Sequence, residues 1–426
     1  MKVLIVSHNP VSANQNMGKT ILTLFSAFRR EELCQLYIYP SIPDADACVS
    51  FYRITDKDVL KSYYKLHVDG REIEGAPGKG VIFENPSDQK IYRHKNNHAP
   101  WKCILRDAMW KCAGWYNREL RDWLDEQRPT CIFVAPGRAK FLYDMAMCLA
   151  GELSVPIVTY LCDDFYFTRP AATLTGRLFQ YLLRGKIDAL MRQAKKCITV
   201  CDAIKDCYAR CFSIPFQTIM TASSHSIAQE IKNVRHTTEI TYMGNIRCGR
   251  YKSLAQIGQE LDEINEENGT SYHLKIYSDE QNQDVLKAFE GIEAIQLCGF
   301  VTGEEFERVF QSADILVHVE SFAPEDIDRV RYSVSTKIAD SLASGICLLA
   351  YGPIEVASIE YIKKEQCGVV CTEQCKLHDT LLKVLDSREC REAAAKNGLR
   401  VAARNHDPEK NQRLVKDIFY EVERAR

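Results

Sequence analysis

The stretch covering residues 313–353 constrains the fold of this chain more than any other. It holds two short apolar runs, residues 315–319 and 346–350, separated by a polar loop and a helical pattern. Apolar runs that do not alternate suit strands buried on both faces of a parallel sheet, although periodicity alone does not exclude a buried helix. The order strand, loop, helix, strand therefore predicts an α/β fold.

A helix is expected between the two runs, over residues 333–345. Ser333 or Ser335 is the expected N-cap and Gly345 the expected C-terminal stop. Its apolar side chains recur at the spacing with which a helix packs onto a sheet, and its polar side chains fall on the opposite face. This second face is open to solvent or to a ligand.

Lys337 falls in the first turn of this helix, where a cation opposes the helix dipole. Either of two anions could compensate the charge of Lys337. Asp340, three residues on, predicts a surface ion pair, whereas a phosphate bound at the helix N-terminus predicts a ligand site. The helix alone favours the ion pair, so the rest of the chain has to decide.

Composition excludes several classes of protein. The chain has 426 residues, 46% hydrophobic and 26% charged, with a formal net charge of −2. This is ordinary for a globular protein of two or three domains, and it is not basic enough for general nucleic-acid binding. Its 18 cysteines form no zinc-binding CxxC…CxxC frame, so we interpret them as reduced, mostly buried thiols of a cytoplasmic protein.

Two successive series of alternating strands and helices predict two domains. The first covers residues 1–225, with an irregular insertion at about 44–100 that can include a hairpin, and one long helix over 102–127. The second covers residues 236–405. A last helix, 406–426, follows. The first apolar run is too short for a signal peptide, and no run reaches the length of a membrane span.

Four residues of the first domain are candidates for ligand contact. His8 and the pair Asp163-Asp164 follow apolar runs, and ligands of open α/β sheets bind at the carboxyl ends of strands. The acidic pair suits an acceptor hydroxyl, or a cap for the next segment. Gly18 permits close approach of backbone to a ligand, or a tight turn. Residues 90–102, basic with aromatics, suit an anionic acceptor, a membrane surface or a solvated loop.

Four motifs of the second domain carry a family resemblance: Tyr242-Met-Gly-Asn-Ile with Arg250, Leu274-Lys-Ile-Tyr277, Leu297-Cys-Gly-Phe300, and Ser335-Thr-Lys-Ile-Ala-Asp-Ser-Leu-Ala-Ser-Gly345. Their order and spacing are typical of GT-B-fold glycosyltransferases of the group 1, retaining family 4-like type. The chain most resembles bacterial capsule, exopolysaccharide and O-antigen glycosyltransferases.

The resemblance implies two Rossmann-like domains facing a cleft, with the C-terminal helix crossing back to the first. It implies a UDP- or GDP-linked sugar as donor, with no separate cofactor, and a glycan or lipid-linked acceptor held mainly by the first domain. The implied setting is cell-surface polysaccharide synthesis at the inner face of the plasma membrane, with peripheral membrane contact. Oligomeric state is left open.

The resemblance also assigns roles in the donor site. Gly244 lets backbone approach the diphosphate, and Arg250 stands at the phosphate-binding lysine. Asn245 replaces a family arginine, and Lys337 is the cation available to make up for it. Asp340 stands where a glutamate usually binds the ribose hydroxyls. The remaining donor-site residues are Gly18, Tyr277, Gly299, Ser335 and Thr336.

The catalytic residue is less defined. Tyr332 occupies the place of a glutamate that many retaining members carry near the donor sugar, and Glu320 is the nearby substitute. If transfer inverts the anomeric centre, His8, Asp163 or Asp164 is available as base. If transfer retains the configuration of the anomeric centre, the departing phosphate can serve as the base.

No metal site is expected. Asp326/Asp328 and Asp44/Asp46 have DxD spacing, but such pairs arise easily among 57 acidic residues, and GT-B enzymes usually work without a metal. An alternative function remains: a catalytically weak or inactive relative that serves as partner subunit of another transferase.

Overall fold

The computed structural model describes residues 1–12, 16–44, 46–76, 99–170, 172–232 and 239–425, and the chain divides into two compact units. The first unit comprises Met1–Met220 and Glu409–Arg426, and the second Thr221–Pro408. The boundary between the two units therefore follows Met220, whereas the sequence analysis places the end of the first domain at residue 225. The C-terminal helix belongs to the first unit.

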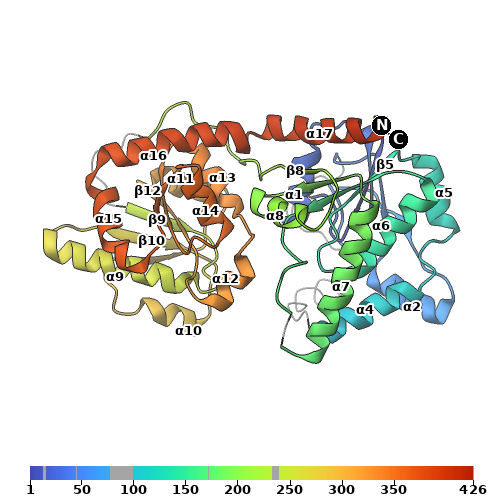
Figure 1. The fold of residues 1–426 in the computed structure, drawn as a ribbon, viewed down its shortest axis with the longest axis horizontal. Helices are drawn as coiled ribbons and strands as arrows, with labels where there is room; N and C mark the ends of the chain where they lie inside the picture. Colours follow the sequence, from blue (N-terminus) through green and yellow to red (C-terminus); the bar gives the residue numbers. More distant parts are fainter. Residues whose placement is uncertain (13–15, 45, 77–98, 171, 233–238, 426) are drawn as a thin grey trace. The chain divides into compact units, whose positions relative to one another are not determined.

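The first unit is built on an eight-stranded sheet in the order β4-β3-β2-β1-β5-β6-β7-β8 (Figure 1). All neighbouring strands are parallel except β3 and β4. Its strands are β1 (Val3–Ser7), β2 (Leu33–Tyr37), β3 (Ser50–Arg53), β4 (Arg71–Glu72), β5 (Cys131–Val134), β6 (Ile157–Leu161), β7 (Lys196–Thr199) and β8 (Phe216–Thr218).

Helices cover this sheet. They are α1 (Asn16–Phe25), α2 (Asp56–Lys65), α4 (Pro100–Cys112), α5 (Arg118–Gln127), α6 (Lys140–Leu153), α7 (Leu174–Gln193), α8 (Asp202–Ala209) and α17 (Pro408–Arg424), with a 3₁₀ turn at Arg30–Glu32. Helix α17 packs through Phe419, which contacts the rings of Phe25 and Phe133. Its Lys416 pairs with Glu32 at 3.1 Å. The last helix therefore completes the core of the first unit, at the carboxyl end of the sequence.

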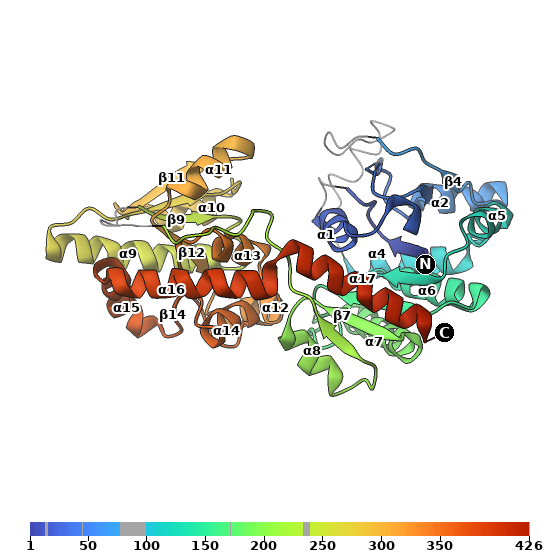
Figure 2. The same ribbon diagram turned by 90° about the horizontal axis from the view of Figure 1, so that it is seen from above.

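The second unit has a six-stranded parallel sheet in the order β11-β10-β9-β12-β13-β14 (Figure 2). Its strands are β9 (Glu239–Met243), β10 (His273–Tyr277), β11 (Ile295–Gly299), β12 (Ile315–Val319), β13 (Cys347–Tyr351) and β14 (Val369–Cys371). Its helices are α9 (Arg250–Asn268), α10 (Gln283–Leu286), α11 (Gly303–Ser312), α12 (Pro324–Val330), α13 (Thr336–Ala343), α14 (Ala357–Lys364), α15 (Leu377–Asp386) and α16 (Arg388–Val401).

The expected strand-helix-strand stretch forms as β12, α13 and β13. Both strands are buried along their whole length, as non-alternating apolar runs require. Ser335 is the N-cap of α13, and its side chain accepts from the Lys337 amide. Gly345 follows the helix with a positive φ of 72°, the conformation that glycine adopts at no steric cost.

Two expectations for the first domain were wrong. The single helix over 102–127 is two helices, α4 and α5, because Gly114 lies between them and Asn117 caps α5 through a 3.0 Å bond from the Leu120 amide. The insertion at 44–100 is more regular than expected: β3 and β4 pair antiparallel, as the strands of a hairpin would, but α2 lies between them. It contains β3, whose Phe51–Arg53 backbone is buried and paired with β2. Residues 77–98, including most of the basic segment 90–102, lie outside the described residues.

All 18 cysteines are free thiols. Cys112, Cys211, Cys298 and Cys375 are exposed, and the others are partly or fully buried. Burial raises the pKa of Cys34, Cys131, Cys347 and Cys367 to about 12. These buried thiols are packing residues rather than reactive groups. Within the described chain, no helix combines the length and apolarity needed to cross a bilayer.

Candidate active site

A cavity of about 170 Å³ opens at the carboxyl ends of β9 and β12, beside the N-termini of α9 and α13. Asn245, Arg250, Ser335, Lys337 and Asp340, all expected donor-site residues, line it. Parallel strands bring their carboxyl ends to one edge of the sheet, so residues distant in sequence meet there. This edge of the second unit is the candidate active site.

Lys337 points its amine at the end of β9. Nζ donates to the carbonyl of Met243 at 2.8 Å, and a Cβ added to Gly244 would lie 2.2 Å from Nζ. The absent side chain of Gly244 thus leaves the space in which the ammonium sits. The residue as a whole is exposed, yet its amine end is enclosed. Desolvation there, followed by the charge of Arg250, lowers the pKa of Lys337.

The hydrogen bonds of Lys337 and Asp340 bear on which of two anions, Asp340 or a bound phosphate, is the partner of Lys337. The amine does not pair with Asp340, since its hydrogen bond goes to Met243 and Asp340 is bonded elsewhere. The surface ion pair, which the helix alone favoured, does not form, and the phosphate that the family resemblance implies stays a prediction. Among the residues that the structure describes, no carboxylate lies at hydrogen-bonding distance of the ammonium, so a bound phosphate would stabilise it.

Arg250 is the first residue of α9, and Glu320 holds it. Its Nε donates to Glu320 Oε2 at 3.0 Å and its Nη2 to Oε1 at 2.8 Å. Glu320 is only 2% exposed; burial raises the pKa of its carboxyl, and Arg250 opposes that shift. We expect this bidentate pairing to keep the carboxylate ionised at neutral pH. Because both oxygens bind Arg250, Glu320 orients the arginine, and the expected direct catalytic role loses support.

His318 on β12 also lines the cavity, although sequence reasoning missed it. Its Nε2 lies 2.9 Å from Ser358 Oγ, in a buried pair. Burial, with the charges of Arg250 and Lys337, lowers the pKa of His318 to about 3. The ring is therefore neutral near pH 7, and it adds no positive charge to the site.

Asp340 lies one turn after Lys337 and is fixed through one oxygen. Its Oδ1 accepts from Ser223 Oγ at 3.1 Å, from the Ser224 amide at 2.7 Å and from Ser224 Oγ at 2.9 Å. Oδ2 makes no hydrogen bond to the described residues. A carboxylate held this way can accept from a ligand hydroxyl without first losing a rotamer.

Phe306, Phe310 and His225 form an aromatic wall on one side of the cavity, which was not predicted from the sequence. Phe306 and Phe310 of α11 line the cavity, with their rings stacked at 5.8 Å. His225 stacks on Phe310 at 5.4 Å. Their i, i+4 spacing is what any helix uses to pack on a sheet, so the sequence alone does not show that these rings, which also pack in the core, line a cavity.

Of the remaining predicted donor-site residues, only Asn245 is among those that line the cavity, and Tyr277, Gly299 and Thr336 are not. Asn245 lines it and shapes the loop, since its Oδ1 accepts from the Arg247 amide at 3.0 Å. Tyr277 ends β10, and its carbonyl accepts from the Gly244 amide at 2.9 Å. Gly299 has a φ of 76°, and its carbonyl accepts from the Ser278 amide. Thr336 is exposed at the start of α13.

Gly18 in the first unit has a structural reason of its own. It lies inside α1, and a Cβ there would come 2.4 Å from the carbonyl oxygen of Pro10 and 3.0 Å from the amide of Ser12. The close approach is to the loop that follows β1. The sequence analysis expected Gly18 either to approach a ligand or to form a tight turn. Gly18 is instead a buried helical residue, and its close approach is to the chain's own backbone.

His8 is engaged at both ring nitrogens. Arg106 Nη2 donates to Nε2 at 2.9 Å, so Nδ1 carries the proton and donates to Asn9 Oδ1 at 3.1 Å. Arg106 in turn binds Asp56 at 2.8 Å. The nitrogen that a general base would use is occupied by an arginine.

The two carboxylates after β6 separate into different roles. Asp164 Oδ1 accepts from the amides of Tyr166 and Phe167 and from Tyr208 Oη, at 2.9–3.0 Å. Asp164 therefore caps the segment that follows, as one of the two sequence alternatives had it. Asp163 is exposed, and it is the acidic residue of this pair that can face an acceptor.

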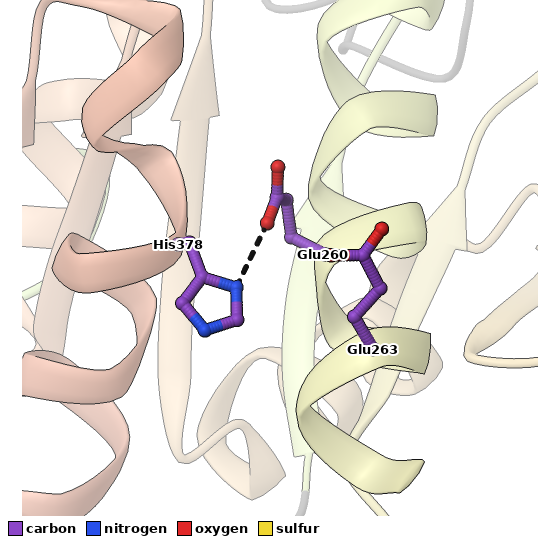
Figure 3. A group of neighbouring side chains, drawn as sticks. All are labelled: Glu260, Glu263 and His378. Carbon is purple, nitrogen blue, oxygen red and sulfur yellow. Dashed lines mark hydrogen bonds and ion pairs between the residues drawn. The ribbon is translucent and has the colours of Figure 1, made fainter. Parts of the chain in front are cut away.

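A second group of ligating side chains lies outside the cavity lining. Glu260 and Glu263 of α9 and His378 of α15 bring one ligand atom each within 4.8 Å of one another. Figure 3 shows the His378 ring pointing to the Glu260 carboxylate, with 3.0 Å between Nδ1 and Oε2. This contact is an ion pair or hydrogen bond that joins the two helices.

Comparisons with known proteins agree on the fold. No protein-family model and no curated protein sequence matched. Sucrose-phosphate synthase from Thermosynechococcus elongatus has a TM-score of 0.62 at 9% identity, covering 100% of both chains. HepE of Anabaena in complex with UDP has a TM-score of 0.60 at 13% identity, over 99% of this chain and 100% of that one. The chain has the GT-B fold.

A third structure extends the likeness. WaaG, a glycosyltransferase involved in lipopolysaccharide biosynthesis, has a TM-score of 0.52 at 13% identity, over 97% of this chain and 99% of that one. Identities this low establish the GT-B fold and leave the activity to be argued from the residues.

Proposed function

We propose that this GT-B protein transfers a sugar from a UDP- or GDP-linked donor to a glycan or lipid-linked acceptor in cell-surface polysaccharide synthesis. The observation that carries the proposal is the Lys337 amine, held over Gly244 beside Arg250 with its pKa lowered. Two cations at the carboxyl edge of one sheet, one of which has no carboxylate hydrogen-bonded to it among the described residues, suit a diphosphate.

The chemistry follows from where charge develops. When the bond between sugar and diphosphate breaks, negative charge grows on the departing phosphate, and fixed cations stabilise that charge. Lys337 supplies an ammonium, and Arg250 keeps Nη1 available beyond its two bonds to Glu320. Asp340 Oδ2 suits the ribose hydroxyls, and Phe306 suits one face of the base.

The similar structures support the donor and the setting. Structures of HepE carry UDP and UDP-glucose, and WaaG takes part in lipopolysaccharide biosynthesis. These statements concern those proteins. They favour UDP as the first nucleotide to test for this chain.

The acceptor step has two routes. For inversion, Asp163 is the candidate base, since His8 Nε2 binds Arg106 and Asp164 caps its own loop. For retention, the departing phosphate takes the acceptor proton, and no side-chain base is required. Product stereochemistry distinguishes the routes.

The test is a thermal-shift panel with UDP-, GDP-, ADP- and CMP-sugars, followed by hydrolysis and transfer assays with the best binder. We expect a UDP- or GDP-sugar to raise the melting temperature. Lys337→Ala should weaken binding by about 1.5–3 kcal/mol, or about ten- to hundredfold in Kd. Lys252→Ala, at an exposed lysine of α9, is the matched control. An unchanged melting temperature with every nucleotide would contradict the proposal.

A partner subunit without activity of its own is the second candidate. It is favoured by Tyr332 in place of a carboxylate, and by Glu320, whose oxygens are both committed to Arg250. Co-purification with an active transferase, together with no donor hydrolysis by the purified chain, would support this function instead.

A further inference from the structure

A group of metal-ligating side chains lies where α9 packs on α15, within the second unit. Glu260 and Glu263 of α9 and His378 of α15 each offer one ligand atom, and the three atoms lie within 4.8 Å of one another. Figure 3 shows the His378 ring directed at the Glu260 carboxylate, with Glu263 on the next turn of α9. Residues at i and i+3 share one face of a helix, so α9 alone brings the two carboxylates together.

The His378 ring has a carboxylate at each of its two nitrogens. Nδ1 lies 3.0 Å from Glu260 Oε2, and Nε2 lies 3.7 Å from Glu267 Oε2. A neutral imidazole has only one N–H. With that proton on Nε2, facing Glu267, Nδ1 turns a lone pair toward Glu260, and a cation between them would satisfy both. A histidine that binds a metal through one nitrogen and faces a carboxylate through the other has this arrangement.

The carboxylates around His378 are not balanced by basic side chains. Within the described parts of the chain, no lysine or arginine forms a hydrogen bond or ion pair with Glu260, Glu263 or Glu267. Glu260 and Glu263 are three residues apart and Glu263 and Glu267 four apart, and like charges at these spacings repel on a helix. A divalent cation would remove this repulsion, because it is the largest local charge of any site that holds one.

The two helices hold these side chains on a rigid frame. Leu261 and Ile264 of α9 and Leu377 and Leu381 of α15 are at most 1% exposed, and they belong to one core cluster. Ligands carried by packed helices keep their geometry better than ligands on loops. The His378 side chain is 29% and the Glu260 side chain 28% exposed, so water can reach the group and complete a coordination shell.

We propose that Glu260, Glu263 and His378 Nδ1 bind one Zn²⁺, which joins α9 to α15. Zinc accepts imidazole nitrogen together with carboxylate oxygen, whereas Ca²⁺ and Mg²⁺ prefer shells of oxygen alone. Bonds of roughly 2.0–2.2 Å set tetrahedral ligand atoms about 3.3 Å apart, close to the 3.0 Å between Nδ1 and Glu260 Oε2. Water fills the fourth position, and Glu267 orients the ring through Nε2.

This zinc site is structural and separate from the donor cavity. None of its four side chains lines that cavity. Glu260 follows Arg250 by about 15 Å along α9, at 1.5 Å per residue. The metal therefore stabilises the helix that begins with Arg250 and takes no part in sugar transfer. The sequence analysis considered only DxD pairs as metal sites, and it had no signal for a pairing between residues 118 positions apart.

The test is zinc binding by the untagged full chain, freed of metal with a chelator and kept without nucleotide. Titration calorimetry and elemental mass spectrometry measure affinity and stoichiometry. We expect one zinc per chain that His378→Ala does not bind, and a melting temperature that rises with zinc concentration. Glu263→Gln should weaken zinc binding at least about tenfold. Glu267→Gln should weaken it about ten- to hundredfold, the usual effect of losing a group that orients a ligand.

The cysteines require a control, because thiolates also bind zinc. Co²⁺ in place of Zn²⁺ distinguishes the ligands, since thiolate ligation adds a strong near-ultraviolet band that nitrogen and oxygen ligands lack. His67→Gln removes a histidine with a single carboxylate at 3.7 Å, and Glu266→Gln removes an exposed carboxylate of α9. Both should leave zinc affinity unchanged. If His378→Ala fails to fold, Glu263→Gln decides, because that side chain is exposed.

Three results would overturn the proposal. These are equal zinc stoichiometry in the native chain and in His378→Ala, a cobalt spectrum dominated by thiolate ligation, and a melting temperature that zinc leaves unchanged. Each would reduce the group to a histidine–carboxylate contact between two helices. Because no nucleotide is present, these outcomes leave the proposal of sugar transfer standing, and a failure of nucleotide binding would leave the zinc site standing.

Discussion

At the scale of single residues, position matters more than charge for the candidate donor site. Lys337 is useful there because Gly244 has no side chain and the Met243 carbonyl holds the amine at 2.8 Å. Arg250 is useful because Glu320 fixes its plane. Each cation is oriented before a ligand arrives, which reduces the entropy that binding must overcome.

Nucleotide affinity should fall as pH rises through the lowered pKa of Lys337. Only the charged amine binds phosphate well, and desolvation moves its loss of a proton below 10.5, the ordinary value. Affinity is therefore highest at lower pH and is lost on the alkaline side. Calorimetric titrations at increasing pH measure this.

Lys337→Arg is the matched variant for that series, because a guanidinium stays protonated throughout. Its affinity should be flat over the range in which the native protein loses affinity. A parallel decline in both proteins would show that another group titrates.

Glu320→Gln should distinguish a positioning residue from a catalytic one. The amide keeps an acceptor but loses the charge that faces Arg250, so we expect about 1–3 kcal/mol less stability and a raised KM for the donor. Kinetics with varied donor concentration, beside a urea titration, measure both effects. A fall in kcat with KM unchanged would place Glu320 in the chemistry itself.

At the scale of elements, local pattern was a good guide where neighbouring residues define the structure. The β12, α13 and β13 stretch follows from runs and caps a few residues apart, and Ser335 caps α13 as one alternative had it. The prediction of one long helix over 102–127 was wrong because the hydrophobic spacing continues across Gly114. The break depended on the Asn117 cap, whose effect outweighed the spacing.

The same distinction explains the site. Arg250, Lys337 and Asp340 were predicted from motifs, and the structure brings them to one cavity. The pairing of Arg250 with Glu320, the engagement of His8 by Arg106 and the aromatic wall were not predicted. The first two join residues far apart in the chain, for which one sequence holds no pairing signal, and the i, i+4 spacing of Phe306 and Phe310 does not distinguish a cavity wall from core.

Gly18→Ala should destabilise the first unit by about 1–3 kcal/mol, because the new methyl group would meet the backbone of the β1 loop at 2.4 Å. Gly151→Ala in α6 is the control, since no atom lies within 4 Å of its added Cβ. We expect that change to be neutral or stabilising by about 0.5–1 kcal/mol. Denaturant titration gives both values. Equal stability of the two variants would argue against close packing at Gly18.

Removal of divalent metal should leave sugar transfer unchanged. The cavity residues offer cations and hydrogen-bond donors for the diphosphate, and the Glu260, Glu263 and His378 group lies in α9 and α15 outside the lining. Assays in excess chelator, and with His378→Ala, measure this. Turnover that only Mn²⁺ or Mg²⁺ restores would show that the prediction is wrong.

At the scale of the whole molecule, we expect the stability of the two units to depend differently on pH. His318 in the second unit has its pKa lowered from 6.5 to about 3 by burial, and burial also lowers the pKa of His406. The unfolded chain therefore binds more protons than the folded one below pH 6.5. Stability is present above that value and is lost as pH falls, by up to about 1.4 kcal/mol per pH unit for each histidine.

We expect mild acid to lower the unfolding temperature of the second unit before that of the first. In the first unit, the lowered pKa of Glu32 acts only below its ordinary value of 4.5. Calorimetry from pH 7 to pH 5 measures the two transitions. His318→Asn should flatten the slope of the second unit, whereas His67→Gln, at an exposed position of the first, should leave it unchanged.

The buried thiols are spread over both units, so their labelling rates can measure how often each unit opens locally. Cys34 and Cys131 are buried in the first unit, and Cys347 and Cys367 in the second. A buried thiol reacts with a maleimide only while its surroundings are open, so its labelling rate reports the free energy of that opening. Mass spectrometry after timed labelling would give the free energy of local opening for each unit separately, in the unmodified chain. Cys112 and Cys375, which are exposed, serve as the fast-reacting references.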